Sequence, residues 1–279
     1  MTQLLNGAVC AKHIESELEK IVNKQKERGI FPKLVVILVG QHSASQIYVR
    51  NKERAAKRIG IESETMVLDE SITEEQLLQK IKQLNEDSLC HGILVQMPLP
   101  DHINKEKVMQ AIDPLKDVDG FHPLNIGYLC TGQDGMKPCT PYGIMTLLNY
   151  YHISVAGKKV VIVGRSQIVG RPMLQLLLNE HATVTICHSK TKNIEMELKQ
   201  ADIVIMAIGS ARWLKKEWVK EGVVVIDVGM NRLSDGLCGD VDEAVANKAK
   251  AMTPVPGGVG PMTIAMLMAQ TVKASMKEH

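Results

Sequence analysis

The sequence predicts an α/β protein of two domains, and three observations support this prediction. Runs of β-branched and apolar residues, such as 33–40 and 160–163, alternate with amphipathic stretches along the chain. Most of these runs are continuously apolar, which is typical of strands buried on both faces of a parallel sheet. The chain has 279 residues, which is long enough for two hydrophobic cores.

Composition and charge exclude several classes of protein. The 33 basic residues nearly balance the 31 acidic ones, so the overall charge gives no reason to expect a nucleic-acid partner or a membrane surface. No positively flanked apolar stretch opens the chain, and no run approaches about 18 apolar residues, so neither export nor membrane spanning is expected. The six cysteines show no C-x-x-C spacing. Because the cysteines are scattered in this way, the sequence predicts free thiols in a cytoplasmic protein and no metal site.

The first half of the chain is predicted to alternate helices and strands. Its predicted elements are a helix over 8–28 that Gly29 ends, a strand over 33–40, a helix over 43–60, a short strand over 66–68, a helix opening at 73–75 and a strand over 91–96. Loops rich in Pro, Gly and Asp occupy 97–100 and 113–123. Loops at strand ends are where α/β proteins place groups that contact ligands.

The second half opens with a helix for which Thr140 is the predicted N-cap and Pro141 the first residue. A buried strand over 160–163 then runs into a glycine turn at Gly164 and an amphipathic helix that begins near Pro172. Strand, glycine turn and helix in this order predict a Rossmann-like domain that binds a pyrophosphate at the start of the helix. Ser166 replaces the second glycine of G-x-G-x-x-G and Gly170 comes one residue late, so a plain glycine turn is the alternative.

The next strand, predicted over 182–187, ends without the acidic residue that would bind the ribose 2′-hydroxyl of NAD. The segment 188–192 reads H-S-K-T-K instead, and Arg165 lies in the glycine turn. Hydroxyl and cationic groups suit a 2′-phosphate, so the predicted cofactor is NADP. Strands over 202–209 and 222–229 follow, then 254–261 (P-V-P-G-G-V-G-P), which is predicted to be neither helix nor central strand, and a last helix over 262–276.

The predicted helix 43–60 places Ser45, Tyr48 and Lys52 at spacing i, i+3 and i+7, on one face. Because many other charges surround them, an ordinary solvated face is one interpretation. The other is a catalytic face, since a partly desolvated lysine beside an aromatic ring can move protons near neutral pH.

Six blocks of sequence together resemble the methylenetetrahydrofolate dehydrogenase/cyclohydrolase family. They are S-x-x-Y-V-x-x-K-x-x-A-A-x-x-x-G-I (45–61), V-Q-M-P-L-P (95–100), D-V-D-G-F-H-P (117–123), P-C-T-P (138–141), V-G-R-S-x-x-V-G-x-P (163–172) and P-V-P-G-G-V-G-P-M-T (254–263). The blocks span the chain in family order. The chain has no room for the separate formyltetrahydrofolate ligase domain of some longer relatives, so it resembles the stand-alone bacterial form.

The resemblance implies two consecutive reactions in a cleft between the domains. NADP⁺ takes a hydride from 5,10-methylenetetrahydrofolate, and water opens the methenyl product to 10-formyltetrahydrofolate. It also implies a homodimer formed through the cofactor domain. On this basis residues 1–139 and 268–279 are expected to form the catalytic, folate-binding domain and residues 140–267 the Rossmann-like NADP-binding domain.

Site residues are transferred position by position onto the matching blocks. Lys52 matches the catalytic lysine, Tyr48 the tyrosine that stacks near the aminobenzoyl ring, and Gln96 the glutamine that binds the lysine. Asp119 matches the residue that holds the pterin. The remaining expected ligand contacts are Pro256, Gly257 and Gly258 for folate and nicotinamide, and Gly164, Arg165, Ser166, Gly170 and Ser189 for the cofactor.

The residues alone leave two other functions open. One is another NADP-linked oxidoreductase that acts on a small hydroxy or amino acid, such as a shikimate dehydrogenase. The other is a non-catalytic NADP-binding module, which the glycine turn alone would support. Tyr48, Lys52, Gln96 and Asp119 together disfavour this module, and folate-dependent formation of NADPH would discriminate between all three functions.

Overall fold

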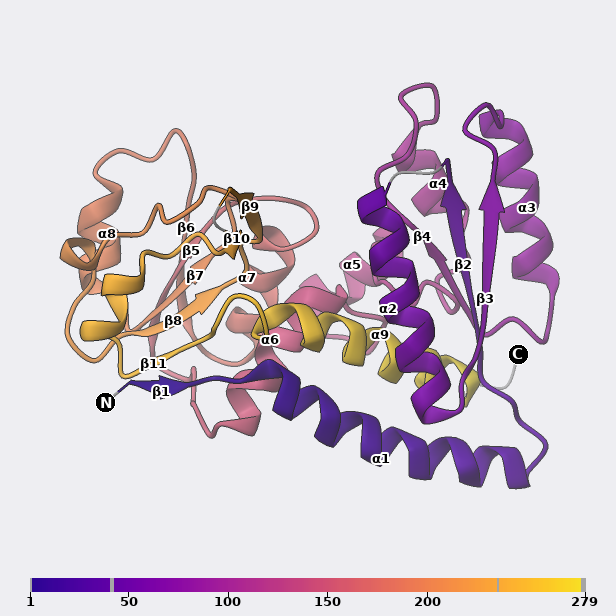
Figure 1. Cartoon of the computed structure of the whole chain (residues 1–279), viewed down its shortest axis with the longest axis horizontal. Coiled ribbons are helices and arrows are strands. Elements are labelled where there is room, and N and C mark those ends of the chain that lie inside the picture. Colours follow the sequence, from indigo (N-terminus) through magenta and orange to yellow (C-terminus); the bar gives the residue numbers. More distant parts are fainter. Residues whose placement is uncertain (1, 41–42, 235, 277–279) are drawn as a thin grey trace. The chain divides into compact units, whose positions relative to one another are not determined.

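The computed structural model describes residues 2–40, 43–234 and 236–276, and the side chains of all of these except 43–45. The chain divides into two compact units. Unit 1 consists of Met1–Ala11 and Thr140–Thr263, and unit 2 consists of Lys12–Cys139 and Ile264–His279. The α-helices and strands of both units are labelled in Figure 1.

Unit 2 is built on a parallel sheet with the strand order β3-β2-β4. Its strands are β2 (Lys33–Val39), β3 (Glu62–Leu68) and β4 (Gly92–Val95). Its helices are α2 (Ser43–Ile59), α3 (Glu74–Glu86), α4 (Lys105–Ala111) and α5 (Pro123–Thr131), with most of α1 (Gly7–Glu27) and of α9 (Val259–Ser275). The parallel pairing confirms the α/β class that the continuous apolar runs predicted for this half.

One face of this sheet packs against α3 and α4 (Figure 1). Alternate residues of β2, among them Val35 and Ile37, are fully buried against Leu77 and Ile81 of α3. The residues between them are also buried, so both faces of the central strand are covered. A capping box starts α3, because Thr73 Oγ1 accepts a hydrogen bond from the backbone N–H of Gln76 at 3.2 Å while the Gln76 side chain bonds back to Thr73.

Unit 1 contains a parallel sheet with the order β1-β11-β8-β7-β5-β6. These strands are β1 (Gln3–Leu4), β5 (Lys159–Val163), β6 (Thr183–Cys187), β7 (Ile203–Met206), β8 (Val224–Asp227) and β11 (Ala251–Met252). Its other elements are α6 (Cys139–Tyr150), α7 (Gly170–Asn179), α8 (Ile194–Gln200), two short 3₁₀ helices, η1 (Lys216–Trp218) and η2 (Glu243–Asn247), and a hairpin of β9 (Asn231–Leu233) and β10 (Gly236–Cys238). The strand order reverses between β5 and β7, as in a doubly wound dinucleotide-binding fold.

The rows of aligned side chains across this sheet form its core. Val161, Val204 and Val225 are partners in register on neighbouring strands, and all three are fully buried. Leu198 of α8 and Val245 of η2 pack on this same face. The register brings the carboxyl ends of β5, β7 and β8 to one edge of the sheet.

Some of the predicted element boundaries were wrong. The helix after Pro138 begins at Cys139, so Thr140 lies in its first turn rather than at its N-cap. The last helix begins at Val259 rather than at 262, because Pro261 falls in its first turn, where the missing N–H costs no hydrogen bond. Strand β3 also extends back to Glu62, four residues before the predicted start.

Among the residues described, no helix combines the length and the apolar character needed to cross a membrane.

Candidate active site

Helix α2 places Tyr48 and Lys52 one turn apart on the same side of the helix. The Tyr48 side chain is 42% exposed, whereas that of Lys52 is half-buried. The side chain of Ser45, the third member of the predicted face, lies outside the described part of the structure. An exposed ring beside a half-buried amine is therefore the surface that this helix presents.

Lys52 is joined to Gln96, which follows the carboxyl end of β4. Lys52 Nζ donates a hydrogen bond to Gln96 Oε1 at 2.9 Å. The amide nitrogen of Gln96 is already committed, because Nε2 donates to the backbone carbonyl of Met97 at 2.8 Å. The amide therefore presents only its oxygen to Lys52, and it accepts a hydrogen bond from the amine but donates none to it.

Asp119 lies in the loop between α4 and α5, near enough to Lys52 for the two charges to interact. The backbone of this loop packs closely against the backbone at Lys137. Gly120 has a φ of +78°, and a Cβ added there would lie 2.3 Å from the carbonyl carbon of Lys137. Only glycine fits this contact, which brings Asp119 beside Cys139.

The carboxylate of the neighbouring Asp117 binds groups of the protein itself. Its carboxylate accepts hydrogen bonds from the backbone N–H groups of Gly120 and His122, at 3.1 and 2.7 Å, and from the Asn125 side chain at 2.9 Å. Asp117 is buried and Asp119 is half-exposed. The first aspartate of D-V-D-G thus shapes the loop, while the second is the more exposed of the two and lies beside Lys52 and Cys139.

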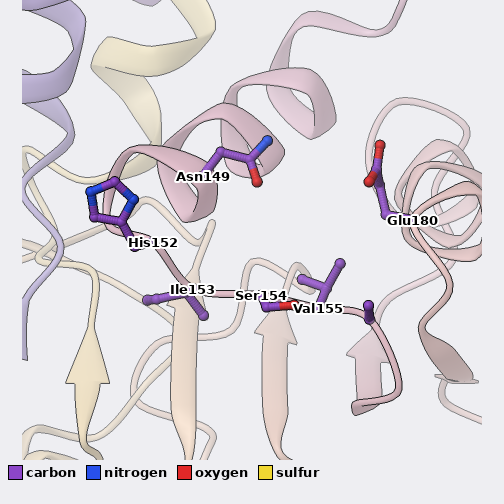
Figure 2. A pocket seen from close by; sticks show the side chains of 7 residues that line it. Asn149, His152, Ile153, Ser154, Val155 and Glu180 are labelled. Carbon is purple, nitrogen blue, oxygen red and sulfur yellow. The ribbon is translucent and has the colours of Figure 1, made fainter.

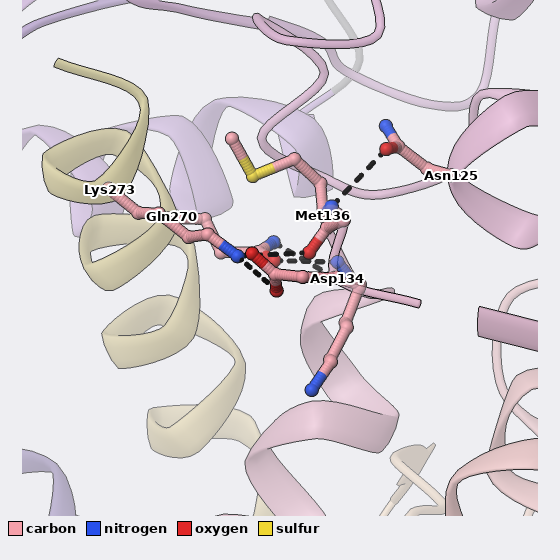
Figure 3. A network of polar contacts seen from close by, with 7 residues as sticks. Asn125, Asp134, Met136, Gln270 and Lys273 are labelled. Carbon is pink, nitrogen blue, oxygen red and sulfur yellow. Dashed lines mark hydrogen bonds and ion pairs between the residues drawn. The ribbon is translucent and has the colours of Figure 1, made fainter. Parts of the chain in front are cut away.

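Gln270 of α9 forms hydrogen bonds to the backbone of the loop that carries Asp119 (Figure 3). Its Nε2 donates to the carbonyls of Val118 and Lys137 at 2.7 and 2.8 Å, and its Oε1 accepts from the backbone N–H of Lys137 at 2.6 Å. The Cys139 thiol donates to the Val118 carbonyl at 3.2 Å. The side chain of Gln270 therefore fixes the two backbone segments that flank Asp119.

Burial shifts the pKa values of the groups at this site in opposite directions. Desolvation lowers the pKa of Lys52, and the charge of Asp119 partly opposes this. Desolvation raises the pKa of Asp119 to about 6, while Lys52 acts in the opposite sense and Asp117 adds to the rise. Burial also raises the pKa of the Cys139 thiol well above its ordinary value, so this cysteine is an uncharged neighbour. The site can hold an amine and a carboxyl group that both exchange protons nearer to neutrality than usual.

The predicted cofactor turn lies at the carboxyl end of β5 in unit 1. Gly164 has a φ of +124°, and a Cβ on it would lie 2.2 Å from the carbonyl oxygen of Ala207. Gly170 starts α7, and a Cβ there would lie 2.0 Å from the carbonyl oxygen of Gly164. Ser166 Oγ accepts from the backbone N–H of Val169 at 3.1 Å, so the serine closes a turn that a second glycine would leave open. Arg165 and Ser166 are exposed above this turn.

The loop after β6 lies beside that turn, because β5 and β6 pair in parallel. His188 and Thr191 close the loop, since the His188 N–H donates to Thr191 Oγ1 at 2.9 Å. Ser189, Lys190 and Lys192 remain exposed. Glycine contacts, a helix start and exposed cationic and hydroxyl groups fit a dinucleotide with a 2′-phosphate.

The predicted ligand loop 256–258 lies between β11 and α9. Gly257 has a φ of +101° and its carbonyl accepts from the backbone N–H of Ala8 at 3.1 Å. A Cβ on Gly7 would lie 1.8 Å from the carbonyl oxygen of Gly258, so two glycines allow the start of α1 to touch this loop. Pro256 is exposed.

The structure therefore brings Lys52, Gln96 and Asp119 together in unit 2, with Tyr48 one turn away on the same helix. It places Gly164, Arg165, Ser166, Gly170 and Ser189 along the carboxyl edge of the unit 1 sheet. The roles of these residues stay predictions. Within the described ranges no group of three or more His, Cys, Asp or Glu side chains could hold a metal ion.

A separate hollow of about 320 Å³ in unit 1 belongs to neither group (Figure 2). It is lined by Asn149, His152, Ile153, Ser154, Val155, Ala156 and Glu180. Several of these residues shortly precede β5 or β6, so the hollow lies at the amino ends of the strands. This is the edge opposite to the glycine turn.

Sequence reasoning missed Asp117, Cys139, Asn125 and Gln270 as residues that shape the site. Gln270 could have been found, because it is an isolated amide in the otherwise apolar stretch 264–270 of the last helix. A buried amide needs partners, so its position marks a polar contact.

Comparisons with known proteins agree with this geometry. The model of the tetrahydrofolate dehydrogenase/cyclohydrolase catalytic domain matches residues 5–119, and that of the NAD(P)-binding domain of the same family matches residues 138–279. A protein of Streptococcus agalactiae, named bifunctional protein FolD, is 55% identical, with 99% of each chain covered.

Two solved structures are similar over nearly the whole chain. The methylenetetrahydrofolate dehydrogenase/cyclohydrolase of Campylobacter jejuni is 50% identical with a TM-score of 0.98, and 99% of each chain is covered. The Trypanosoma brucei enzyme, solved with NADP and an inhibitor, is 38% identical with a TM-score of 0.93, covering 99% of this chain and 97% of that one. Both family models and these similarities show that the chain belongs to the tetrahydrofolate dehydrogenase/cyclohydrolase family.

Proposed function

We propose that this protein oxidises 5,10-methylenetetrahydrofolate with NADP⁺ and then hydrolyses the methenyl product to 10-formyltetrahydrofolate. The observation that carries this proposal is the Lys52–Gln96 hydrogen bond beside Asp119, within the segment that the catalytic-domain model matches. Membership of the family favours this function over a small hydroxy-acid or amino-acid dehydrogenase and over a non-catalytic NADP module.

Lys52 is the proposed proton carrier of the hydrolysis. The methenyl carbon lies between two nitrogens and is already electrophilic, so attack by water needs a positioned water molecule and a base. The lowered pKa of Lys52 increases the share of uncharged amine near neutral pH. An uncharged amine can take the proton of the attacking water, and Gln96 Oε1 then accepts a hydrogen bond from the ammonium that forms.

Asp119 is the proposed anchor for the pterin ring. With a pKa of about 6, its carboxyl group is mostly ionised at neutral pH. Two carboxylate oxygens match the paired N–H donors of the amino-pyrimidinone edge. Tyr48 offers an exposed ring for stacking against the aminobenzoyl group.

Hydride transfer does not need an acid or a base among these side chains. The lone pair of a folate nitrogen drives the hydride from the one-carbon bridge, so no proton has to move through the protein in this step. When bound, NADP⁺ supplies the acceptor for that hydride. Residues Gly164, Arg165, Ser166, Gly170 and Ser189 are proposed to hold it by its phosphates, and Pro256, Gly257 and Gly258 to line the folate and nicotinamide.

One assay tests the proposed function. Purified protein is mixed with NADP⁺ and 5,10-methylenetetrahydrofolate, and absorbance is followed at the NADPH and methenyl wavelengths. We expect NADPH to form only when both ligands are present, and added methenyltetrahydrofolate to decay faster than in buffer. Binding of NADP⁺ without any folate-dependent reduction would leave only the binding-module function.

Two further properties belong to the proposal. The resemblance supports a homodimer formed through the cofactor domain, and the exposed apolar side chains of Leu233 and Leu237 on the β9–β10 hairpin offer a surface for it. Sedimentation velocity at micromolar concentration should give a mass near twice 30.8 kDa. The free state of all six cysteines supports a cytoplasmic location.

A further inference from the structure

A buried carboxylate in unit 1 binds three consecutive backbone amides. Asp240 Oδ2 accepts from the N–H groups of Ile208 and Gly209 at 2.8 and 2.9 Å, and Oδ1 accepts from the N–H of Ser210 at 2.8 Å. The Asn231 side chain donates to Oδ1 at 3.0 Å. Every one of these partners is a donor, so both oxygens are used as acceptors and neither faces an acceptor.

The loop that Asp240 binds, Ala207–Ser210, leaves the carboxyl end of β7. Strand β7 neighbours β5 where the strand order reverses, and the Ala207 carbonyl lies against Gly164 of the cofactor turn. In open α/β sheets a dinucleotide crosses the crevice at this reversal. A dinucleotide with its 2′-phosphate end beside the loop after β6 would extend its nicotinamide half over the loop after β7.

Consecutive amides can converge on one carboxylate only in a special backbone conformation. Gly209 has a φ of +64°, which is left-handed. A left-handed residue within such a turn makes successive N–H groups point into one concavity that binds an anion. Here the anion is part of the protein, so the loop is ordered without any ligand.

Asp227, at the end of β8, holds Asp240 in turn. Its Oδ1 accepts from the backbone N–H of Asp240 at 2.9 Å and its Oδ2 from that of Val241 at 3.0 Å. Two glycines make room for the carboxylates. A Cβ on Gly239 would lie 1.9 Å from Asp227 Oδ2, and a Cβ on Gly229 would lie 2.2 Å from Asp240 Oδ1.

We propose that Asp240 is a positioning residue of the NADP site, which fixes Ile208–Ser210 in the shape that receives the nicotinamide half of the cofactor. This inference rests on the proposed use of NADP. Asp240 is fully buried, so it acts through the loop and does not touch the ligand. The loop presents Ile208, whose side chain is 37% exposed.

Asp240→Asn tests the inference with little change of shape. Each carboxylate oxygen accepts from two donors, so the amide NH₂ faces two donors in either orientation. We expect the dissociation constant for NADP⁺ to rise about tenfold or more. The dissociation constant for adenosine 2′,5′-bisphosphate, which lacks the nicotinamide, should change less than about twofold. Amide hydrogen exchange at 208–210 should accelerate in the unliganded variant.

Asp202→Asn is the matched control. Asp202 precedes β7 at the opposite edge of the sheet, where it accepts from the Lys159 N–H and from Lys220 Nζ. This control should leave the affinity for both ligands unchanged. Unchanged NADP⁺ affinity in Asp240→Asn, or an equal loss of affinity for both ligands, would overturn the inference.

Two measurements remain available if Asp240→Asn does not fold. In the wild-type protein without ligand, the amides of Ile208, Gly209 and Ser210 should exchange slowly, and free exchange at all three would contradict a preformed loop. Asn231→Ala removes one donor and keeps the carboxylate, and it should weaken NADP⁺ binding more than bisphosphate binding; equal effects would count against the inference. A wild-type protein that fails to bind NADP⁺ would instead refute the proposed function itself.

Discussion

Lys52 and Asp119 favour each other's charged forms, while burial acts against the charge on both. The amine is therefore easier to deprotonate than an exposed lysine, and the carboxyl group is easier to protonate than an exposed aspartate. The first two predictions follow from this pair.

Lys52→Met should reduce methenyl hydrolysis about 10²- to 10⁴-fold, because it removes the proposed base. The dehydrogenase should lose less, since hydride transfer needs no proton carrier. Both rates can be measured on the same preparation by the methenyl and NADPH absorbances.

Lys52→Arg is the sharper variant, since a guanidinium keeps the positive charge and does not release its proton in this pH range. It should remain as deficient in hydrolysis as the methionine variant. Hydrolysis at a near wild-type rate in either variant would exclude Lys52 as the base, and an equal fall of both activities would make it a positioning residue.

Asp119→Asn should weaken folate binding and lower both activities together, because one acceptor of the pterin's donor pair becomes a donor. In the wild type, folate affinity should fall as pH drops through about 6, where Asp119 gains its proton. The sign follows from the ligand, since N–H donors favour the ionised carboxylate and compete with protonation. The fall should approach about tenfold per pH unit below that pKa, for one linked proton.

Fluorescence titration from pH 5 to 8 measures this dependence. The asparagine variant is its own control, because it has no carboxyl group to protonate at this position and should lack the step near pH 6. Unchanged folate affinity in the variant would mean that Asp119 only helps to form the turn and does not bind the pterin.

Arg165→Ala should raise the KM for NADP⁺ about tenfold and leave that for NAD⁺ nearly unchanged, since one charge-assisted contact to the 2′-phosphate disappears. Arg232→Ala removes another exposed charge, on β9, and serves as the control. Steady-state kinetics with both cofactors give the comparison. Equal changes of the KM for NAD⁺ and NADP⁺ would mean that Arg165 does not contact the 2′-phosphate.

Lys116→Met should destabilise unit 2. The buried Nζ of Lys116 donates to the carbonyls of Leu84, Asn85 and Asp87 at 3.0, 2.8 and 2.7 Å, which caps the end of α3. Methionine leaves these carbonyls without that donor, at a cost of about 2–4 kcal/mol in the free energy of unfolding.

Urea denaturation should show a lower midpoint for this variant, while Lys105→Met, on the exposed part of α4, should unfold like the wild type. An unchanged midpoint would mean that water replaces the amine at these carbonyls.

Much of the fold could be predicted because its central strands are continuously apolar. Strand β2 matched its predicted range closely for this reason. Strand β3 was recognised only at its end, because it is an edge strand whose exposed side includes Glu62 and Glu64. The helix α5 was missed, since P-L-N-I-G-Y-L-C-T lacks a clear helical period.

The contacts within the site were harder to predict than its members. Lys52 and Gln96 are 44 positions apart, so only the family resemblance paired them before the hydrogen bond was seen. Asp240 shows no periodic pattern that would distinguish it from a turn aspartate. Its partners are backbone amides, which every residue except proline carries, so residue types reveal nothing about them.

The place of Gln270 makes the catalytic half of this enzyme dependent on helix α9. Ile264–His279 belong to unit 2, although the rest of that unit is complete by Cys139. A fragment ending at Cys139 would keep Lys52, Gln96 and Asp119 but would lose the amide that joins Val118 to Lys137. Loss of α9 should therefore damage folate chemistry directly, and supplying this helix as a separate peptide is the natural route to restoring it.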